Sequence, residues 1–276
     1  MEFDLHTHSR ASDGSMEPGE LVGLAKELGL QGLAITDHDT VDGLEEGLFF
    51  GRVYNVEVIP GIELSTDFAG HEVHLLGYFI DWRAACLAQA LKEMTEQRAN
   101  RIKKMLLRLA ELGFPLDFAE VQQIAGAGVI GRPHLAVAMV NAGYVTDVQE
   151  AFARFLTKGA PAYVAREKID FRAAVQLIKK AKGVPVLAHP GLLKDNSLVK
   201  RIIDCGIEGM EVDYPEHAPA YRQYLMELCR LHGLVATGGS DFHGKIKDVS
   251  LGKCGASRNI VEQLRRKRED DDVQYS

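Results

Sequence analysis

The 276-residue sequence lacks the features of a secreted, membrane-spanning or DNA-coating protein. Its four cysteines stand at scattered positions without paired spacing, which favours free thiols and a cytoplasmic location. No apolar run approaches the ~20 residues of a membrane-spanning helix, and the N-terminus has no basic-then-apolar signal segment, so we expect no membrane association. The net charge of -7 argues against stable, non-specific binding to duplex DNA, although bound divalent cations would reverse that sign locally.

What the sequence does contain is typical of a globular α/β protein, with 46% hydrophobic and 26% charged residues. Short apolar strands alternate with helical patterns in residues 1–83 and 163–264. Residues 84–162 show helical patterns only and predict a helical insertion, or cap. Seven strands alternating with helices predict a parallel sheet closed into a barrel. The charge-dense, apolar-poor segment 265–276 is expected to be disordered.

The first expected strand ends in a His-x-His motif. Side chains two residues apart share one face of a strand, so His6 and His8 can both face one cation. Asp13 follows a Ser-rich bend and can fold back beside them. For this stretch alone, two histidines facing solvent remain an ordinary alternative.

More histidines and carboxylates stand near the ends of the later strands. Barrel active sites are assembled from the C-terminal ends of several strands. A structural role is the commoner explanation for any single residue, such as His74, but a whole set at one depth indicates a metal centre. The set consists of His6, His8, Asp13, His38, Glu63, His74, His189, Asp241 and His243.

Nine candidate ligands exceed the number that one ion uses, so two or three divalent ions are expected. Glu63 lies in the middle of the set and is the natural bridge between ions. Imidazole and carboxylate ligands without thiolate suit Mn²⁺, Fe²⁺ or Zn²⁺. Paired ions, ~3.5–4 Å apart in known two-metal sites, activate water and clamp the attacking and leaving oxygens. Phosphate esters need such help because their uncatalysed hydrolysis is very slow.

These motifs resemble, in their order and over most of the chain, the polymerase-and-histidinol-phosphatase (PHP) superfamily. The resemblance rests on His6-x-His8, Ser12-Asp13-Gly14, Thr36-Asp37-His38-Asp39, Gly61-Ile62-Glu63, Ala188-His189-Pro190 and Gly239-Ser240-Asp241-x-His243. It implies a distorted (β/α)7, TIM-like barrel with a trinuclear metal centre. The implied ligands are His6, His8, Glu63 and Asp241 for one ion, Asp13, His38 and His243 for a second, and Glu63, His74 and His189 for a third.

Catalytic roles are expected for Glu63, His189 and Asp241 within that centre. Many members of the superfamily have histidine where Asp13 stands. A carboxylate there favours Mn²⁺ or Fe²⁺ over Zn²⁺, so Mn²⁺ is the expected ion.

The insertion contains Gly131-Arg132-Pro133-His134, which resembles a motif of free-standing phosphoesterases of this superfamily, where the insertion helps to bind substrate phosphate. A guanidinium fork matches phosphate oxygens, so Arg132 and His134 are expected to bind a substrate phosphate. A surface ion pair explains Arg132 equally well. Additional phosphate contacts are expected from Ser9 and Arg10, and weaker candidates, for which solvated helix positions are the better explanation, are Arg98, Arg101 and Lys158.

The expected function is therefore hydrolysis of nucleotide phosphate esters by a metal-bound hydroxide. Nucleoside 3′,5′-bisphosphates and short 5′-phosphorylated oligonucleotides, degraded 5′→3′, are both possible substrates. Alternatives are a histidinol-phosphate-type phosphomonoesterase and an amide or lactone hydrolase. The latter usually has a bridging lysine where Glu63 stands. A non-enzymatic scaffold attached to a polymerase is a further alternative, but it would not need a complete ligand set.

Overall fold

The computed structural model describes residues 2–126, 130–193 and 195–274. Its contacts divide the chain into two compact units. Residues 1–89 and 169–276 form one unit, which contains the strands and is called the barrel unit here, and residues 90–168 form the other, called the cap unit. The division falls a few residues later than the expected insertion, 84–162, because helix α3 (Ala85–Glu111) begins within the barrel unit.

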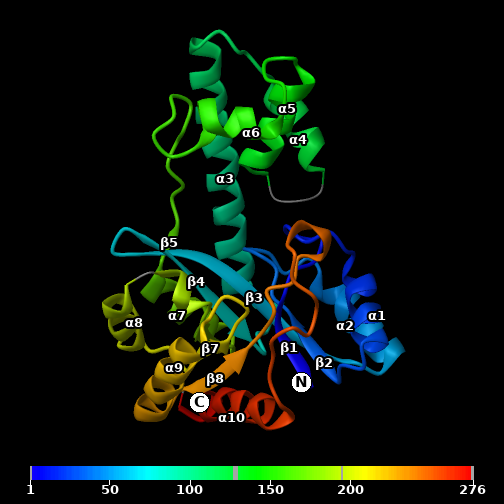
Figure 1. The fold of residues 1–276 in the computed structure, drawn as a ribbon, viewed down its shortest axis with the longest axis vertical. Helices are drawn as coiled ribbons and strands as arrows, with labels where there is room; N and C mark the ends of the chain where they lie inside the picture. Colours follow the sequence, from blue (N-terminus) through cyan, green and yellow to red (C-terminus); the bar gives the residue numbers. More distant parts are fainter. Residues whose placement is uncertain (1, 127–129, 194, 275–276) are drawn as a thin grey trace. The chain divides into compact units, whose positions relative to one another are not determined.

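The strands of the barrel unit form a nearly closed barrel of seven strands, as expected (Figure 1). A two-residue strand, β5 (Ile169–Asp170), pairs with β3 outside this path. The barrel approaches closure where the chain after its last strand meets its first, because the amide of His8 donates to the carbonyl oxygen of Phe242 at 2.9 Å. The strands, in spatial order, are β1 (Phe3–Thr7), β2 (Gly32–Ile35), β3 (Glu57–Phe68), β4 (His71–Tyr78), β6 (Val184–Leu187), β7 (Gly209–Asp213) and β8 (Val235–Gly238).

The expectation of an all-parallel sheet is wrong for β4, which pairs antiparallel with both β3 and β6. Strand β3 continues past Glu63 to Phe68 and turns back through Ala69 and Gly70, both with positive φ. An antiparallel strand begins at the end where its parallel neighbours finish. His74, near the start of β4, therefore lies at the same end of the barrel as the carboxyl ends of the parallel strands.

Amphipathic helices cover the outside of this barrel, with α1 and α2 on one side of the strands and α7, α8 and α9 on the other (Figure 1). Helix α7 shows why they do so: its apolar residues recur every three or four positions and are buried, while its last turn carries Lys179 and Lys180. These five helices are α1 (Pro18–Glu27), α2 (Leu44–Tyr54), α7 (Phe171–Lys180), α8 (Asn196–Ile203) and α9 (Pro219–His232).

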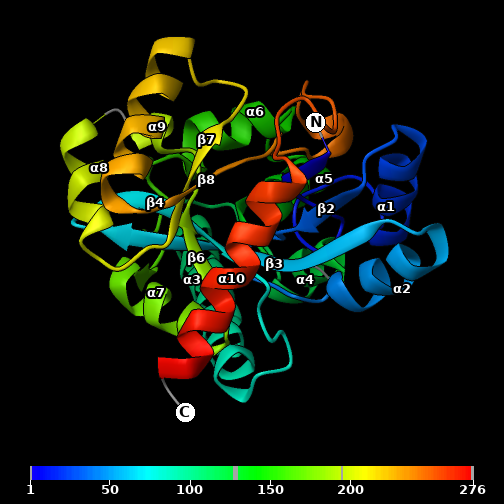
Figure 2. The same cartoon turned by 90° about the horizontal axis from the view of Figure 1, so that it is seen from below.

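Helix α10 (Arg258–Gln274) crosses the opposite end of the barrel, where the parallel strands begin (Figure 2). Its Val261 and Leu264 are fully buried in one cluster with Phe3, Val184 and Val235, which stand at or near the starts of β1, β6 and β8. Helix α10 therefore does not cover the end at which the parallel strands finish, and the candidate ligands lie at that end.

The expected disorder of residues 265–276 is wrong for the described part, because α10 continues to Gln274. Arg265 contacts a carboxylate oxygen of Glu57 at 2.8 Å and covers the ring of Phe79. A helix that is anchored by buried residues in its first turns can continue through residues 265–269, whose long charged side chains have good helix propensity. Composition alone did not reveal that anchor.

The cap unit is helical and has its own core. Besides α3, it contains α4 (Phe118–Ala125), α5 (Arg132–Asn141), α6 (Val148–Ala151) and a π-helical turn, η1 (Phe152–Leu156). Buried residues from all of these elements form one cluster, which includes Met105, Val121, Leu135, Ala151 and Phe155. Among the helices of the described residues, none is both long and apolar enough to cross a membrane.

Candidate metal centre

All nine candidate ligands come together at the end of the barrel where the parallel strands finish. The ligand atoms form four overlapping groups, and the atoms within each group lie within 4.8 Å of one another. Each side chain comes from a strand or from the residues that follow one. The groups are, first, His6, His8 and Asp241; second, His8, Asp13, His38 and His243; third, His6, Glu63 and His189; and fourth, His38, Glu63 and His74.

Glu63, on β3, stands at the middle of these groups. Its side chain is 1% exposed. Oε1 lies 3.0 Å from both His74 Nδ1 and His189 Nε2. Oε2 faces three further imidazole nitrogens, at 3.1 Å (His38 Nδ1), 3.2 Å (His8 Nε2) and 3.3 Å (His6 Nε2). A buried carboxylate with five imidazoles around its two oxygens has the arrangement expected of a bridge between cations.

The first group consists of His6, His8 and Asp241. The Nε2 atoms of His6 and His8 face each other at 3.1 Å, and Asp241 Oδ1 lies 3.6 and 3.3 Å from them, respectively. The other oxygen of Asp241 accepts hydrogen bonds from the Tyr214 hydroxyl (2.9 Å) and Lys247 Nζ (2.6 Å). One carboxylate oxygen of Asp241 therefore faces the two histidines, while hydrogen bonds from Tyr214 and Lys247 fix the position of its other oxygen.

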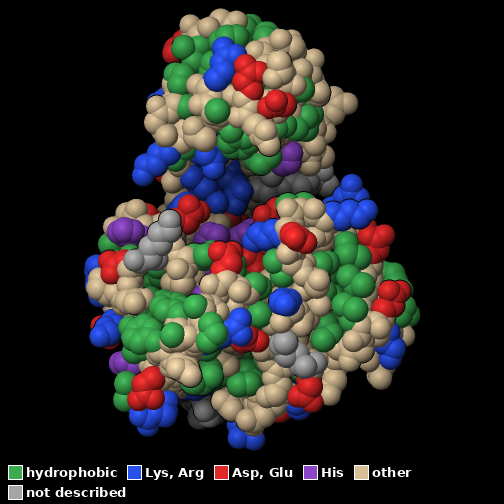
Figure 3. All heavy atoms as spheres, viewed as in Figure 1, with side chains coloured by type: hydrophobic (Ala, Val, Ile, Leu, Met, Phe, Trp, Pro, Cys, Tyr) green, Lys and Arg blue, Asp and Glu red, His purple; other side chains and the backbone are tan. Residues whose placement is uncertain are grey.

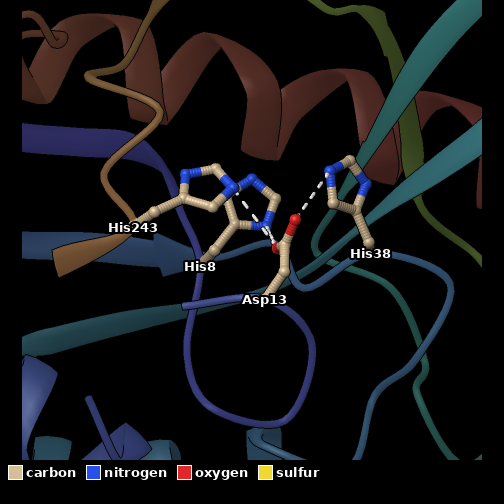
Figure 4. A group of neighbouring side chains, drawn as sticks. All are labelled: His8, Asp13, His38 and His243. Atoms are coloured by element: carbon tan, nitrogen blue, oxygen red, sulfur yellow. Dashed lines mark ion pairs between the residues drawn. The ribbon is translucent and has the colours of Figure 1, made fainter. Parts of the chain in front are cut away.

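The second group surrounds Asp13, whose carboxylate lies between His38 on one side and His8 with His243 on the other (Figure 4). Asp13 Oδ1 is 3.3 Å from His243 Nε2 and 3.6 Å from His8 Nδ1, while Oδ2 is 3.9 Å from His38 Nε2. His8 thus presents one ring nitrogen to each group, whereas the expected ligand sets placed it in the first alone. The side chain of Asp13 is 53% exposed, whereas the rings of His8 and His243 are buried, so Asp13 is the member of this group that faces solvent.

The donor atoms of the site fit divalent cations. Among the described residues, His8 Nδ1, His38 Nδ1 and Glu63 Oε2 are buried without a hydrogen-bond partner. Buried polar atoms left unsatisfied are costly, and so they are uncommon in folded proteins. A cation near these three atoms would satisfy them, and imidazole and carboxylate donors suit Mn²⁺, Fe²⁺ and Zn²⁺.

The charges of the site indicate what balances the carboxylates when no ion is bound. Burial lowers the pKa of His8 and of His74, but nearby carboxylates outweigh burial and raise each pKa to about 9. Burial dominates at His38 and lowers its pKa to about 4. Burial raises the pKa of Glu63, but the surrounding imidazoles outweigh it and hold the pKa well below its ordinary value. Protons on His8 and His74 therefore balance part of the negative charge of the carboxylates, and bound cations would replace these protons.

Comparison with known proteins identifies the family. A family profile for the PHP domain matches residues 4–236. The chain belongs to the PHP domain family. The 5′-3′ exoribonuclease Rnm of Escherichia coli is 34% identical over 260 residues, which is 91% of this chain and 88% of that protein.

Two further relatives of similar identity bear other names. A phosphoribosyl 1,2-cyclic phosphate 1,2-diphosphodiesterase of Eggerthella lenta is 35% identical over 89% of this chain and 95% of that protein. A 3′,5′-nucleoside bisphosphate phosphatase of Chromobacterium violaceum is 34% identical over 87% of each. Among solved structures, a protein of Bifidobacterium adolescentis that was assigned to the metal-dependent phosphoesterases has a TM-score of 0.83 at 30% identity, over 96% of each chain.

In this PHP barrel, the buried Asp37 holds the loop that follows β1 and carries Asp13. Asp37 accepts hydrogen bonds from the amide (2.7 Å) and hydroxyl (2.6 Å) of Ser9 and from the hydroxyl of Ser12 (2.6 Å). The loop also needs glycine at Gly14, where a Cβ would lie 2.2 Å from the carbonyl oxygen of His8. Ser9 is completely buried, and its hydroxyl is committed to Asp37. The expected phosphate contact by Ser9 is therefore wrong.

Arg10 is exposed, in contrast to Ser9, and pairs with Glu17 at 3.1 Å. This ion pair lies in solvent, where such a pair contributes little to stability. Its guanidinium remains accessible to an anion, so the expected phosphate contact by Arg10 stays a prediction.

Three residues that contact the site were not predicted from the sequence. Tyr214 and Lys247 hold Asp241, as described above, and Glu211 on β7 contacts His6 and His189. Glu211 did carry a usable signal, since it is a carboxylate within a largely buried strand, as Glu63 is. Tyr214 and Lys247 carried none, because tyrosines and lysines are common in loops.

Arg132 opens helix α5 in the cap unit, with Pro133 in the first turn, where proline is tolerated. Its Nη1 donates to the carbonyl oxygen of Leu156 at 3.2 Å. Its guanidinium lies 5.6 Å from the ring of Phe152 and 5.8 Å from that of Tyr163. The ion pair considered as an alternative for Arg132 does not occur among the described residues, so its charge faces no carboxylate.

The guanidinium of Arg101, from α3, lies 5.6 Å from the ring of Tyr163, which Arg132 also contacts. Its Nε donates to the carbonyl oxygen of Val164 at 2.8 Å. Burial and neighbouring arginines, above all Arg132, lower its pKa to about 10. Figure 3 shows Lys and Arg side chains gathered on part of the surface of the cap unit.

The other two cap candidates differ from these arginines. His134 Nδ1 accepts from the amide of Gly131 at 3.1 Å and so caps α5, and burial lowers the pKa of its ring. A neutral imidazole with one nitrogen engaged can offer a phosphate only a single N–H. Lys158 is exposed in a turn after η1, as expected for a solvated side chain.

Proposed function

We propose that this PHP protein is a multinuclear metal-dependent phosphoesterase that hydrolyses phosphate esters of nucleotides. One observation carries the proposal: the buried Glu63 has five imidazoles around its two carboxylate oxygens. A single structural ion would need four ligands, whereas nine converge here. The proposed ligands are His6, His8, Glu63 and Asp241 for one ion, Asp13, His38 and His243 for a second, and Glu63, His74 and His189 for a third, with Mn²⁺ as the preferred ion.

Bound cations would supply Lewis-acid stabilisation of the phosphate oxygens and a water of lowered pKa. The chain's own residues determine where that chemistry occurs. Glu63 and Asp241 are buried and held by several partners, so they fix the inner part of the centre. Asp13 is half exposed, so we place the entry of substrate and water on its side. His189, which shares Oε1 of Glu63 with His74, belongs to the inner part as well.

The arginines of the cap unit support a substrate that carries more than one phosphate. Two guanidinium groups that share one aromatic ring repel each other, and an anion between them would relieve this repulsion. We propose that Arg132, with Arg101 beside it, binds a phosphate other than the one being hydrolysed. A nucleoside 3′,5′-bisphosphate and a short 5′-phosphorylated oligonucleotide both carry such a group. These substrates agree with the names of two of the relatives.

The proposal is tested by metal analysis followed by a phosphate-release screen. The purified chain should hold more than one equivalent of transition metal, and chelation should abolish activity. A nucleoside 3′,5′-bisphosphate, a 5′-phosphorylated trinucleotide and its 5′-hydroxyl counterpart then form the discriminating set. We expect stepwise release of mononucleotides from the 5′-phosphorylated trinucleotide, while the 5′-hydroxyl form resists. At most one equivalent of metal after reconstitution would refute the multinuclear centre.

A further inference from the structure

Glu211, on β7, is a fully buried carboxylate whose two oxygens contact two different candidate ligands. Oε1 lies 3.0 Å from Nδ1 of His6, which comes from β1. Oε2 accepts the backbone N–H of His189, which follows β6, at 2.8 Å. In the described part of the chain, no lysine or arginine forms an ion pair with Glu211, so an ordinary structural salt bridge does not explain it.

The contact with His6 determines which ring nitrogen is available to an ion. A carboxylate that is ionised can only accept hydrogen bonds, so with Glu211 in that form the proton of this contact lies on Nδ1 of His6. Nε2 is then the nitrogen that faces His8, Glu63 and Asp241, at 3.1 to 3.6 Å, and it is the one that would offer a lone pair to an ion there. Carboxylates that hold the remote nitrogen of a metal-binding histidine are a recurring device for fixing ring orientation.

The contact with His189 supports an unusual backbone conformation. His189 has a φ of 25°, in the left-handed region that residues other than glycine rarely adopt. Such a conformation persists when its surroundings hold it in place. The bond from its N–H to Glu211 is one restraint, and it leaves Nε2 of His189 3.0 Å from Oε1 of Glu63.

We propose that Glu211 is a positioning residue that orients His6 and His189 together, so that one carboxylate aligns two of the four ligand groups. This inference rests on the proposed metal centre, and it assigns no direct contact between Glu211 and an ion. The coupling follows from geometry, because His6 lies on β1, His189 follows β6, and both meet at the same side chain. A change at Glu211 therefore disturbs both ligands at once.

The Glu211→Gln variant tests this role because it keeps the size of the side chain but has one acceptor oxygen in place of two. An amide cannot accept from both His6 Nδ1–H and His189 N–H, so one contact is lost. We expect the affinity for Mn²⁺, measured by competition with a chromogenic chelator, to fall ten- to a hundredfold. The rise in unfolding temperature that Mn²⁺ produces should shrink accordingly.

Two further variants separate positioning from stability. Asp213→Asn is the matched control, because Asp213 lies on the same strand and contacts Arg222 and the amide of Gly255, neither of which is a candidate ligand. It should lower the unfolding temperature without changing the affinity for Mn²⁺. Glu211→Asp keeps the charge but is one methylene shorter, so its affinity for Mn²⁺ should fall as that of Glu211→Gln does. If Glu211→Gln does not fold, Glu211→Asp takes its place in the test.

The outcomes distinguish the two proposals. If the wild-type protein binds no Mn²⁺, the metal centre itself is refuted. If the wild-type protein binds Mn²⁺ and both Glu211 variants bind it equally well, only the positioning role is refuted. If the Glu211 variants unfold at a lower temperature than the wild-type protein, by the same amount with and without Mn²⁺, and their affinity for Mn²⁺ is unchanged, Glu211 is a structural residue and the positioning role is refuted. Recovery of affinity in Glu211→Asp would show that charge, not reach, matters, and would also overturn the inference.

Discussion

The barrel unit and the cap unit present their polar residues in opposite ways. In the barrel unit, candidate ligands contact one another, and atoms such as Glu63 Oε2 are buried without a hydrogen-bond partner. In the cap unit, Arg101 and Arg132 are anchored on backbone carbonyls and on the ring of Tyr163. The first arrangement is incomplete without cations, whereas the second is folded and satisfied but carries uncompensated positive charge. We therefore expect substitutions in the barrel unit to affect chemistry and metal binding, and those in the cap unit to affect substrate choice.

The largest effect should follow removal of the charge at the centre of the barrel site. Glu63→Gln keeps the shape but removes the negative charge that five imidazoles face. We expect kcat/KM to fall by more than about a hundredfold, beyond the scale typical of residues that only support a ligand. Metal content, measured by elemental analysis, should fall in the same variant. Full activity with wild-type metal content would mean that Glu63 is not a ligand.

A smaller but general effect should appear as pH dependence of metal binding. Because the pKa values of His8 and His74 are raised to about 9 without ions, protons occupy these rings at pH 7 and compete with cations. Affinity for Mn²⁺ should therefore rise from pH 7 to about 9, by up to about tenfold per pH unit for each proton displaced. Calorimetry in buffers of different ionisation enthalpy would count the protons released, and a pH-independent affinity would contradict the prediction.

The same raised pKa values predict how the chelated protein responds to pH. A histidine whose pKa is higher in the folded than in the unfolded state stabilises the fold below its unfolded pKa, ~6.5. That contribution is lost as pH rises through about 9. The unfolding temperature of the chelated protein should therefore fall between pH 7 and 9.5. The unfolding temperature of the Mn²⁺-loaded protein, in which cations replace the protons, should fall less over the same pH interval.

In the cap unit, Arg132→Ala should act on one class of substrate. For a nucleoside 3′,5′-bisphosphate we expect KM to rise about tenfold or more, on the ~1.5–3 kcal/mol scale of a hydrogen bond to a charged group. An aryl phosphate, which lacks the second phosphate, should be much less affected. Arg154→Ala is the matched control, because Arg154 is an exposed arginine of the same unit that pairs with Glu150. Equal losses on both substrates would assign Arg132 to the chemical step or to the fold.

The contrast between the units also explains what the sequence could predict. The candidate ligands of the barrel unit were identifiable because strand ends fix where side chains converge, so the meeting of His6, His38 and Asp241 could be predicted from their positions along the chain. Glu211 was missed because its role depends on meeting His6 and His189, which lie far from it in sequence. Ser9 was assigned wrongly because no local pattern shows that its hydroxyl faces Asp37. The direction of β4 depends on pairing between strands, which alternation alone does not specify.

The smallest expected effect, from Arg101→Gln, would decide between the two nucleotide substrates. Arg101 shares the ring of Tyr163 with Arg132, so a continuing strand could place its next phosphate against it. We expect a several-fold rise in KM for a 5′-phosphorylated trinucleotide, and a salt dependence of binding that is weaker by ~0.7 in log–log slope, as for one single-strand phosphate contact.

Arg108→Gln serves as the control for this test, because Arg108 lies on the same helix and donates to the carbonyl oxygen of Tyr163. The proposal assigns no phosphate contact to Arg108, so its loss should leave the salt slope unchanged. If Arg101→Gln raises KM for the bisphosphate as much as for the trinucleotide, both arginines bind one phosphate, and the enzyme is better described as a phosphatase of small nucleotides. If only the trinucleotide is affected, the cap arginines follow a strand, and the barrel chemistry serves an exonuclease.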